Sequence, residues 1–565
     1  MLGSIKVRVN GAQCGAEALL LAAITSIGGF MFGYDIGQIS GILLFSSFVA
    51  RFADLQPDGS YQWQPIIQSL IVSFMSIGAL LGAFTGGYTA EWWGRRKSMC
   101  FGVGVYITGT VVQMTAMSTW GHYMAGRFVS GLGIGNLSVV VPMFQSECSP
   151  REIRGAVIAC YQLAITFGIL SANAVNFGMR RIDSWDASWR IVVALGTCCS
   201  IPMAVGVLCL PESPRWLARR EKWEAVRKSV ARLRGMKDDP GHRLVTEDVQ
   251  EIYAVLEKEA RNGKGGWLEC FTGRPGNIPK TRYRTLLGIA IHFLQQWTGV
   301  NYFFYYGSTI FNAAGLHDPI LTQLILGAVN MTMTFFGLYM VERFGRRIPL
   351  FVGALWQSFW LLVFACVGTA RDPKTHPTSG KLMIVAACMF IASFASSWGP
   401  MSWVVVGETF PLRTRAKQAS LATAANWGGN FLIAFFTPLA NAGISYNFGF
   451  VFVATNLTAA TLVWCFLYES VSLSLENVDA MYSAPEVRAW TSAKWAPPGY
   501  LNRKQRNVGV LEEPVQASDL RRFSTAPTAN GSTAGEYVEK TMSGAVMTST
   551  VTRERTYEHI EDNAS

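Results

Sequence analysis

Twelve long apolar runs restrict what this chain can fold into. Each run has about 20 residues or more, the length that an α-helix needs to cross the hydrocarbon core of a bilayer. The runs span residues 19–45, 65–88, 98–117, 119–142, 154–177, 188–210, 284–311, 319–341, 348–369, 382–406, 418–438 and 446–467. Half of the 565 residues are hydrophobic and only 15% are charged, which excludes a soluble enzyme of this size. The sequence therefore predicts an all-α membrane protein with twelve transmembrane helices.

Basic residues gather in the even-numbered short connections between these runs, for example at Arg95, Arg96, Arg346 and Arg347. By the positive-inside rule these connections face the cytosol, together with both termini and the long sixth connection. Most of the net charge of +11 lies in these cytosolic segments and reflects membrane topology, so nucleic acid is not an expected partner.

This topology divides the chain into five predicted parts. They are an N-terminal cytosolic tail (1–18), a first six-helix half (19–210), cytosolic linker helices (211–283), a second six-helix half (284–468) and a C-terminal cytosolic tail (469–565). The last part is rich in Ser, Thr, Arg and Glu and poor in apolar residues, so we expect most of it to be disordered.

A polar stripe interrupts the seventh apolar run. At about 100° per helical residue, one arc of about 120° holds Gln295, Thr298, Asn301 and Tyr305, with Gln296 beside it. Amides in hydrocarbon need partners, so the stripe must face other helices or a water-filled cavity. Because uncharged amides both donate and accept hydrogen bonds, they suit a neutral ligand with many hydroxyls. We therefore hypothesise a transported sugar; the alternative is that the amides only join helices.

A carboxylate and an arginine also lie within predicted spans. Asp35 is in the first run and Arg127 is in the fourth. If both spans meet the outer face near residues 44 and 119, the two groups lie about 14 and 12 Å deep at about 1.5 Å per residue. They can then pair, as a buried charge requires. Two interpretations stay open, a proton-carrying pair and a permanent ion pair that only joins two helices.

Two motifs occur twice, once in each half. Glu-Trp-Trp-Gly-Arg-Arg begins at Glu91 and Glu-Arg-Phe-Gly-Arg-Arg begins at Glu342. The set Glu147, Pro150 and Arg154 recurs at identical spacing as Glu408, Pro411 and Arg415. The chain is therefore a duplicated unit of six spans. A repeat of parallel sense predicts a substrate site between the halves, near the midplane, with the halves rocking to give alternating access.

Further motifs complete an ordered set. Pro-Glu-Ser-Pro-Arg starts at 211, Tyr-Gln-Leu at 161, Trp-Gly-Pro at 398 before Trp403, and Asn-Trp at 426 before Asn430. From about residue 20 to 480 the chain resembles the sugar porter family of the major facilitator superfamily, and within it fungal hexose transporters. The resemblance implies the major facilitator fold, with two pseudo-symmetric halves and a cytosolic helical linker. It also implies a monomeric plasma-membrane transporter that is not an enzyme and uses no cofactor or metal.

The resemblance implies roles for individual residues. Hydrogen bonds to the sugar are expected from Gln162, Gln295, Gln296, Asn301, Asn330 and Asn426, and an apolar platform is expected from Trp403. An outer gate is predicted at Tyr305 and Tyr306, with plain packing as the alternative. A cytosolic salt-bridge network is predicted for Glu91, Arg95, Glu147, Arg154, Glu342, Arg346, Glu408 and Arg415. After the last span, the family's usual Pro-Glu-Thr-x-Gly is replaced by Tyr-Glu-Ser-Val-Ser from residue 468.

In proton-coupled relatives, the acid that matches Asp35 takes up a proton from outside and loosens from the arginine. We therefore predict that Asp35 and Arg127 couple proton entry to hexose entry, glucose being the expected sugar. The expected partners are a monosaccharide, protons and the lipid bilayer. Three alternatives stay open: a facilitative uniporter, a transporter-like sugar sensor, and a polyol or quinate transporter. The sequence has no Gly-x-x-x-x-Gly-Lys-Ser/Thr loop, which argues against an ATP-driven pump.

Overall fold

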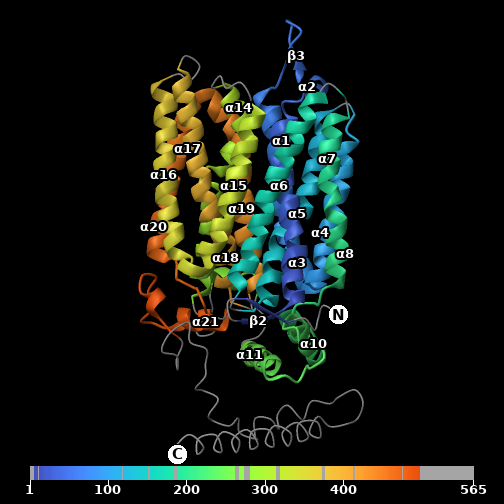
Figure 1. Ribbon diagram of the computed structural model, residues 1–565, viewed down its shortest axis with the longest axis vertical. Coiled ribbons are helices and arrows are strands. Elements are labelled where there is room, and N and C mark those ends of the chain that lie inside the picture. Colours follow the sequence, from blue (N-terminus) through green and yellow to red (C-terminus); the bar gives the residue numbers. More distant parts are fainter. Residues whose placement is uncertain are drawn as a thin grey trace, which may run out of the picture. The chain divides into compact units, whose positions relative to one another are not determined.

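Long helices dominate the structure (Figure 1). The computed structural model describes residues 6–9, 12–117, 119–150, 153–182, 185, 187–260, 266–272, 280–313, 319–371, 376–411, 414–473 and 475–496. Among these residues, strands are limited to two short antiparallel hairpins. The predicted all-α membrane architecture is therefore confirmed.

The first half of the chain forms a group of helices that are coloured blue to teal in Figure 1. They are α1 (Ala16–Ile42), α3 (Pro65–Trp92), α4 (Arg95–Met114), α5 (Trp120–Cys148), α6 (Arg154–Met179), α7 (Ser188–Cys198) and α8 (Ser200–Cys209). Proline opens α3, where its missing N–H has no helical partner to lose. Gly94 separates α3 from α4 with φ +89°, a backbone conformation that favours glycine.

The second half forms a matching group, coloured green to orange in Figure 1. Its helices are α13 (Thr281–Gln296), α14 (Val300–Ala313), α15 (Pro319–Phe344), α16 (Arg347–Ala370), α17 (Pro377–Ser396), α18 (Trp398–Thr409), α19 (Arg415–Ile444) and α20 (Phe448–Phe466). Two spans that were expected to be continuous are broken here. The seventh span is interrupted at residues 297–299 and the tenth at Ser397.

The two halves pack side by side. α3 lies against α19 and α6 lies against α15, with further contacts between α1 and α14 and between α6 and α18. Close approach within a half depends on glycine at some positions. A Cβ at Gly33 of α1 would collide with the carbonyl of Ile165 on α6, so a larger residue would push these two helices apart.

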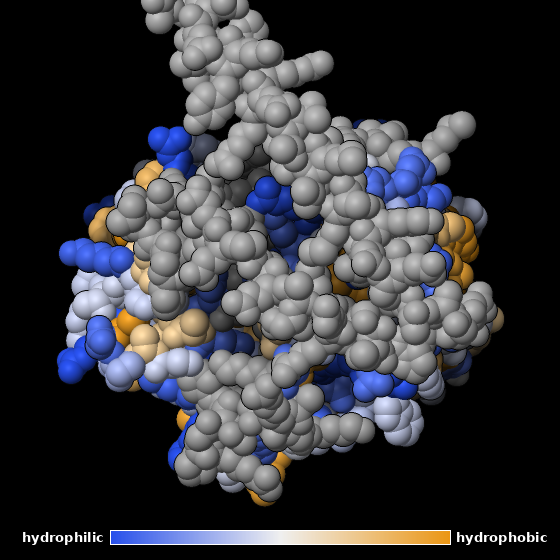
Figure 2. Space-filling model, turned by 90° about the horizontal axis from the view of Figure 1, so that it is seen from below, coloured by the Kyte–Doolittle hydropathy of each residue, from blue (hydrophilic) through white to orange (hydrophobic). Residues whose placement is uncertain are grey.

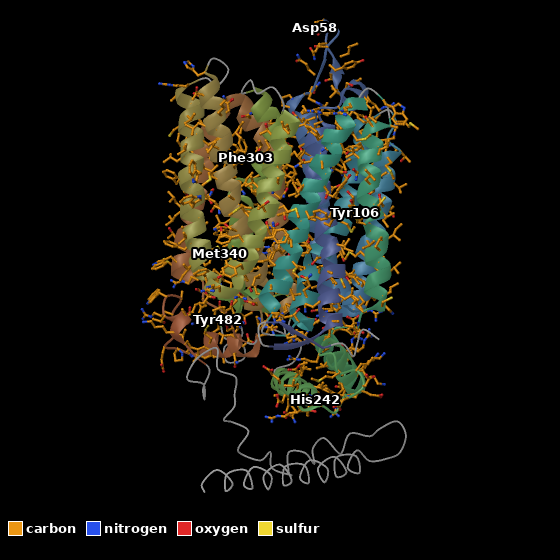
Figure 3. All side chains as sticks on the ribbon, viewed as in Figure 1. Asp58, Tyr106, His242, Phe303, Met340 and Tyr482 are labelled. Carbon is orange, nitrogen blue, oxygen red and sulfur yellow. The ribbon has the colours of Figure 1, made fainter. Side chains whose placement is uncertain are left out.

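Shorter elements cover the ends of the two halves. At one end, called here the linker end, lie β1 (Lys6–Val9), β2 (Ala12–Gly15), α9 (Pro214–Arg219), α10 (Trp223–Leu233), α11 (Arg243–Ala260), α12 (Glu269–Thr272) and α21 (Leu475–Ser483). At the other end, called the distal end, lie α2 (Ser46–Phe52), β3 (Asp54–Leu55) and β4 (Tyr61–Gln62). Figure 3 places His242 and Asp58 at these opposite ends.

The first part of the predicted C-terminal tail is folded. After α20 in the sequence, the chain forms α21 and a short 3-10 turn, Ser492–Lys494. A small apolar core that includes Tyr468, Met481 and Tyr482 holds this segment together. The sequence led us to expect that most of residues 469–565 are disordered, and this segment is ordered because its scattered apolar side chains bury one another.

Nine helices are long and apolar enough to cross a membrane, counted within the described part of the chain. Three further predicted spans are also helical there, as α4, the α13–α14 pair and α19. The count of twelve spans therefore stays a prediction. Large apolar side chains such as Phe335, Phe359 and Trp464 are exposed on the outer surface, as lipid contact requires. Seen from the linker end, the visible described surface shows hydrophilic side chains with hydrophobic patches near its rim (Figure 2).

Candidate functional site

A small cavity with about 40 Å³ of free interior volume lies between the two halves. Its lining comes from both halves and consists of Phe32, Ile36, Gln162, Ile165, Ile169, Gln295, Gln296, Val300, Asn301, Phe304, Asn330, Phe394 and Trp403. Six of the seven residues that were predicted to bind substrate are in this set. The seventh, Asn426, lies behind the lining and contacts it.

The break in the seventh span shapes the centre of this cavity. Gly299 has φ +100°, which no regular helix allows, and it turns the chain between α13 and α14. The polar residues of the predicted stripe therefore lie on both sides of the break. The carbonyl of Trp297 accepts a bond from Thr455 of α20 at 2.6 Å, and that of Thr298 accepts one from Asn456 at 2.9 Å. The backbone groups that leave the helix are thus satisfied inside the protein.

Asn426 on α19 holds the two glutamines in place. Its Nδ2 donates to Oε1 of Gln295 at 2.7 Å and to the carbonyl of His292 at 3.1 Å. Its Oδ1 accepts from Nε2 of Gln296 at 2.9 Å. Gln295 in turn donates to the carbonyls of Trp398 and Gly399, at 3.1 and 3.2 Å. The amides of α13 are therefore oriented before any ligand arrives.

Three amides on other elements complete the polar part of the lining, Gln162 of α6, Asn301 of α14 and Asn330 of α15. Asn301 of α14 donates to Oε1 of Gln296. Asn330 of α15 is 1% exposed, and its Oδ1 has no hydrogen-bond donor within the described residues. A buried acceptor without a donor is costly, so this oxygen suits a ligand hydroxyl.

An indole ring forms one apolar wall of the cavity. Trp403 of α18 packs edge-on against Tyr161, with ring centroids 5.3 Å apart, and against His292, with centroids 4.7 Å apart. His292 lies one helical turn from Gln295 toward the linker end and does not line the cavity. From the first half, Phe32 also lines the cavity, and its ring centroid lies 4.7 Å from that of Trp427. The site thus combines several amides with apolar rings from both halves.

Asp35 and Arg127 form a buried ion pair near the cavity. Oδ2 of Asp35 lies 3.2 Å from Nη1 of Arg127, and the two side chains are 1% and 0% exposed. Gln38 donates to Oδ1 of Asp35 at 2.7 Å, and Arg127 donates to the sulfur of Met75 at 3.4 Å. The structure therefore brings together the carboxylate and the guanidinium that the sequence predicted to pair from their similar depth in the membrane.

The two tyrosines that follow the amides bind α14 to α19. Tyr305 donates to Oδ1 of Asn430 at 2.9 Å, and Tyr306 donates to the carbonyl of Ala434 at 2.6 Å. Both side chains are buried, toward the distal end from Asn301. In the same direction, Asn173 of the first half donates to the carbonyl of Gln323 of the second half at 3.2 Å. Contacts within and between the halves therefore cover the distal side of the cavity.

Each half carries the same ion-pair cluster at the linker end. In the first half, Arg95 binds Glu147 at 2.8 Å, Ser213 donates to Glu147 at 2.5 Å, and Glu212 accepts from the backbone N–H of Arg95 at 3.1 Å. In the second half, Arg346 binds Glu408 at 2.9 Å, Ser470 donates to Glu408 at 2.8 Å, and Glu469 accepts from the backbone N–H of Arg346 at 3.0 Å. Glu-Ser after the last span therefore provides the contacts that Glu-Ser provides after the sixth.

At the linker end, side chains of the two halves also approach each other. Lys417 of α19 lies 3.9 Å from Glu91 of α3, a pairing that the sequence did not suggest. Arg415 is buried, donates to the carbonyl of Phe410, and lies within electrostatic range of Glu147 in the other half. Arg154 is buried as well. The side chain of Glu342, the remaining member of the predicted network, lies outside the described residues.

Comparisons with known proteins agree with this architecture. The family model described as "Sugar (and other) transporter" matches residues 21–482. The hexose transporter HXT10 of Saccharomyces cerevisiae is 38% identical over 484 residues, covering 84% of this chain and 87% of that protein. The high-affinity fructose transporter ght6 of Schizosaccharomyces pombe is also 38% identical, covering 84% and 89%.

A solved structure shows the same fold. The proton:xylose symporter XylE of E. coli, bound to 6-bromo-6-deoxy-D-glucose, aligns with a TM-score of 0.71 and 25% sequence identity. The alignment covers 83% of this chain and 99% of the symporter. These relatives are transporters and not enzymes. The protein therefore belongs to the sugar transporter family of the major facilitator superfamily.

Proposed function

We propose that this protein carries monosaccharides, glucose among them, across the plasma membrane by alternating access. The observation that carries the proposal is the cavity between the halves, where five amide side chains face an indole ring. A sugar that leaves water must replace its hydroxyl hydrogen bonds, each unmade bond costing about 1–3 kcal/mol. Amides supply both donors and acceptors for hydroxyls, and Trp403 supplies an apolar surface for the C–H face of the ring.

In this proposal the two halves have different tasks in binding. The second half supplies Gln295, Gln296, Asn301 and Asn330, with Asn426 as the support behind the glutamines. The first half supplies Gln162 and apolar side chains. Because the fixed amides are concentrated in the second half, movement of the first half opens the path without dismantling the site.

We further propose that the linker end faces the cytosol, as the basic residues of that end favour. The Lys417–Glu91 contact and the attraction between Arg415 and Glu147 then hold the halves together while the cytosolic path is closed. A sugar moves this equilibrium only by its difference in affinity for the two states. Release to the cytosol therefore requires that the affinity of the amides for the sugar falls once the two halves separate.

Proton symport through Asp35 and Arg127 is the energetic part of the proposal. Burial favours the neutral form of an acid, whereas the neighbouring arginine favours the charged form. A movement that separates the two groups therefore changes the proton affinity of Asp35. Asp35 lies between Phe32 and Ile36 on α1, and these two side chains line the cavity. A shift of α1 around bound sugar thus reaches the ion pair directly.

The test of sugar transport is uptake of radiolabelled glucose, fructose and xylose by cells that lack their own hexose carriers. We expect saturable glucose uptake that unlabelled hexoses compete for. Protein that reaches the cell surface and takes up none of the three sugars would overturn the proposal and favour a sugar sensor or a polyol transporter. Sugar uptake that ignores a proton gradient would instead leave a uniporter, in which Asp35 and Arg127 only join helices.

A further inference from the structure

We infer that Asn430 transmits the presence of bound sugar from Gln296 to the Asp35–Arg127 pair. Asn430 is fully buried on α19 and does not line the cavity. Its role is therefore that of a positioning residue. The inference rests on the proposed symport and adds the path by which the sugar site and the proton site communicate.

Three hydrogen bonds place Asn430 between the two sites. Its Nδ2 donates to Oε1 of Gln296 at 3.2 Å. Its Oδ1 accepts from the hydroxyl of Ser76 at 2.8 Å and from the hydroxyl of Tyr305 at 2.9 Å. Two donors occupy both acceptor positions of this oxygen, so the amide cannot turn without breaking a bond on each side.

The bond to Ser76 crosses from the second half to the first. Ser76 follows Met75 on α3, and the sulfur of Met75 accepts a bond from Nη2 of Arg127 at 3.4 Å. Nη1 of the same guanidinium pairs with Asp35 at 3.2 Å. A continuous path of contacts thus runs from Gln296 through Asn430, Ser76 and Met75 to the ion pair.

Tyr305 gives a second connection to the same pair. It lies one helical turn from Asn301, and its hydroxyl is within electrostatic range of both Asp35 and Arg127. The other titratable groups around Asp35 are Tyr106 of α4 and Tyr123 of α5. Neither tyrosine bonds Asn430 in the described contacts. The hydroxyl that faces Asp35 from the second half is therefore the one that Asn430 orients.

Bound sugar disturbs this arrangement at Gln296. Oε1 of Gln296 already accepts from both Asn301 and Asn430. A sugar hydroxyl that donates to this oxygen must displace one of them. When Asn430 is displaced, its Oδ1 moves relative to the hydroxyls of Ser76 and Tyr305, and the surroundings of the ion pair change. Because both ends of the path are buried, these changes are weakly screened.

The test measures how the sugar affinity of the purified protein depends on pH, together with the ratio of protons to sugar in proteoliposomes. Wild type is compared with Asn430→Ala and with Ser76→Ala, which removes a single hydroxyl and leaves the sugar amides intact. Thr437→Val is the matched control, because it removes a buried hydroxyl of α19 that bonds the carbonyl of Ile433 in its own helix.

We expect both relay variants to reduce the pH dependence of the sugar Kd by about fivefold, the effect of about 1 kcal/mol, and to lower the proton-to-sugar ratio. Thr437→Val should keep the wild-type values. Folded Asn430→Ala and Ser76→Ala proteins with the full pH dependence would overturn the relay while the proposed symport stands. Wild type without any pH dependence or proton movement would overturn the symport and the relay together.

Discussion

Gln296 bonds three amide side chains of the site. It donates to Asn426 and accepts from both Asn301 and Asn430. The helical periodicity of the seventh run identified the stripe to which Gln296 belongs, because polar side chains inside an apolar span must face the protein interior or a water-filled cavity. The partners on α19 were less visible. Asn426 and Asn430 lie about 130 residues away in sequence, and only the packing of α13 against α19 brings them to the glutamines.

Asn301→Ala tests the binding role of a single amide. The change removes one hydrogen-bonding group from the cavity, and we expect the glucose Kd to rise by about 5- to 100-fold, corresponding to about 1–3 kcal/mol. Binding is measured on purified protein by tryptophan fluorescence or calorimetry. Gln145→Ala is the control, because Gln145 is equally buried but bonds Thr25 and Ser26 away from the cavity. An unchanged Kd in folded Asn301→Ala would contradict this role.

At the scale of elements, the broken helices are what the sequence did not predict. Residues 284–311 were expected to form one continuous span, and apolar composition alone gives no reason to interrupt it. Gly299 allows the interruption, and Thr455 and Asn456 of α20 satisfy the carbonyls that it frees. These partners are distant in sequence, so a local pattern could not reveal them. The duplicated motifs, in contrast, are local, and the structure places them in equivalent clusters.

Gly299→Ala tests the importance of this break. A Cβ there would meet the ring of Phe452, and alanine disfavours φ +100° by about 1–2 kcal/mol. We expect a lower melting temperature in detergent and weaker sugar binding, because Gln296 and Asn301 lie on either side of the break. Gly104→Ala on α4 is the control, since a Cβ at that position would meet no heavy atom of the described residues within 4 Å. If Gly299→Ala and Gly104→Ala have the same melting temperature, the break between α13 and α14 tolerates a side chain at residue 299, and the prediction is wrong.

For the whole molecule, the arrangement of the two halves followed from the repeat and from the motif set, which together predicted the major facilitator fold. The individual side-chain contacts between the halves could not be predicted from the repeat or the motifs. Lys417 and Glu91 meet because α3 packs along α19, and their sequence neighbourhoods give no sign of this pairing. The pair is partly exposed, with side chains 16% and 28% accessible, so its contribution is small, about 0.2–1 kcal/mol.

Lys417→Glu should open the linker end, because it places two carboxylates in contact. Cys270 of α12 reports this opening, since it is buried and lies within electrostatic range of both Lys417 and Glu91. Burial raises the pKa of the Cys270 thiol to about 11, which keeps it protonated and slow to react with maleimide at pH 7–8. Opening exposes the thiol, which lowers its pKa and speeds its reaction with maleimide. If loss of the ion pair shifts the equilibrium toward the open state by about 1 kcal/mol, the labelling rate rises by up to about fivefold.

Loss of Lys417 without any opening has the opposite effect. The ammonium lowers the pKa of Cys270, so its removal alone would raise that pKa and slow the labelling. The double variant Lys417→Glu with Glu91→Lys restores the ion pair and should return the rate toward that of wild type. All measurements use protein in which the exposed cysteines Cys198, Cys209, Cys366 and Cys465 are replaced by serine. Slower labelling in Lys417→Glu would contradict a closing role for this pair.

The proposed coupling of the sugar site to a proton-carrying Asp35 is tested most directly by proton movement. Wild type and Asp35→Asn are reconstituted in vesicles with a trapped pH indicator, and glucose is added outside without any imposed gradient of protons. We predict that the lumen of wild-type vesicles acidifies as glucose enters. Asp35→Asn should exchange glucose across the membrane without moving protons. Glucose entry into wild-type vesicles with no change in internal pH would contradict the account.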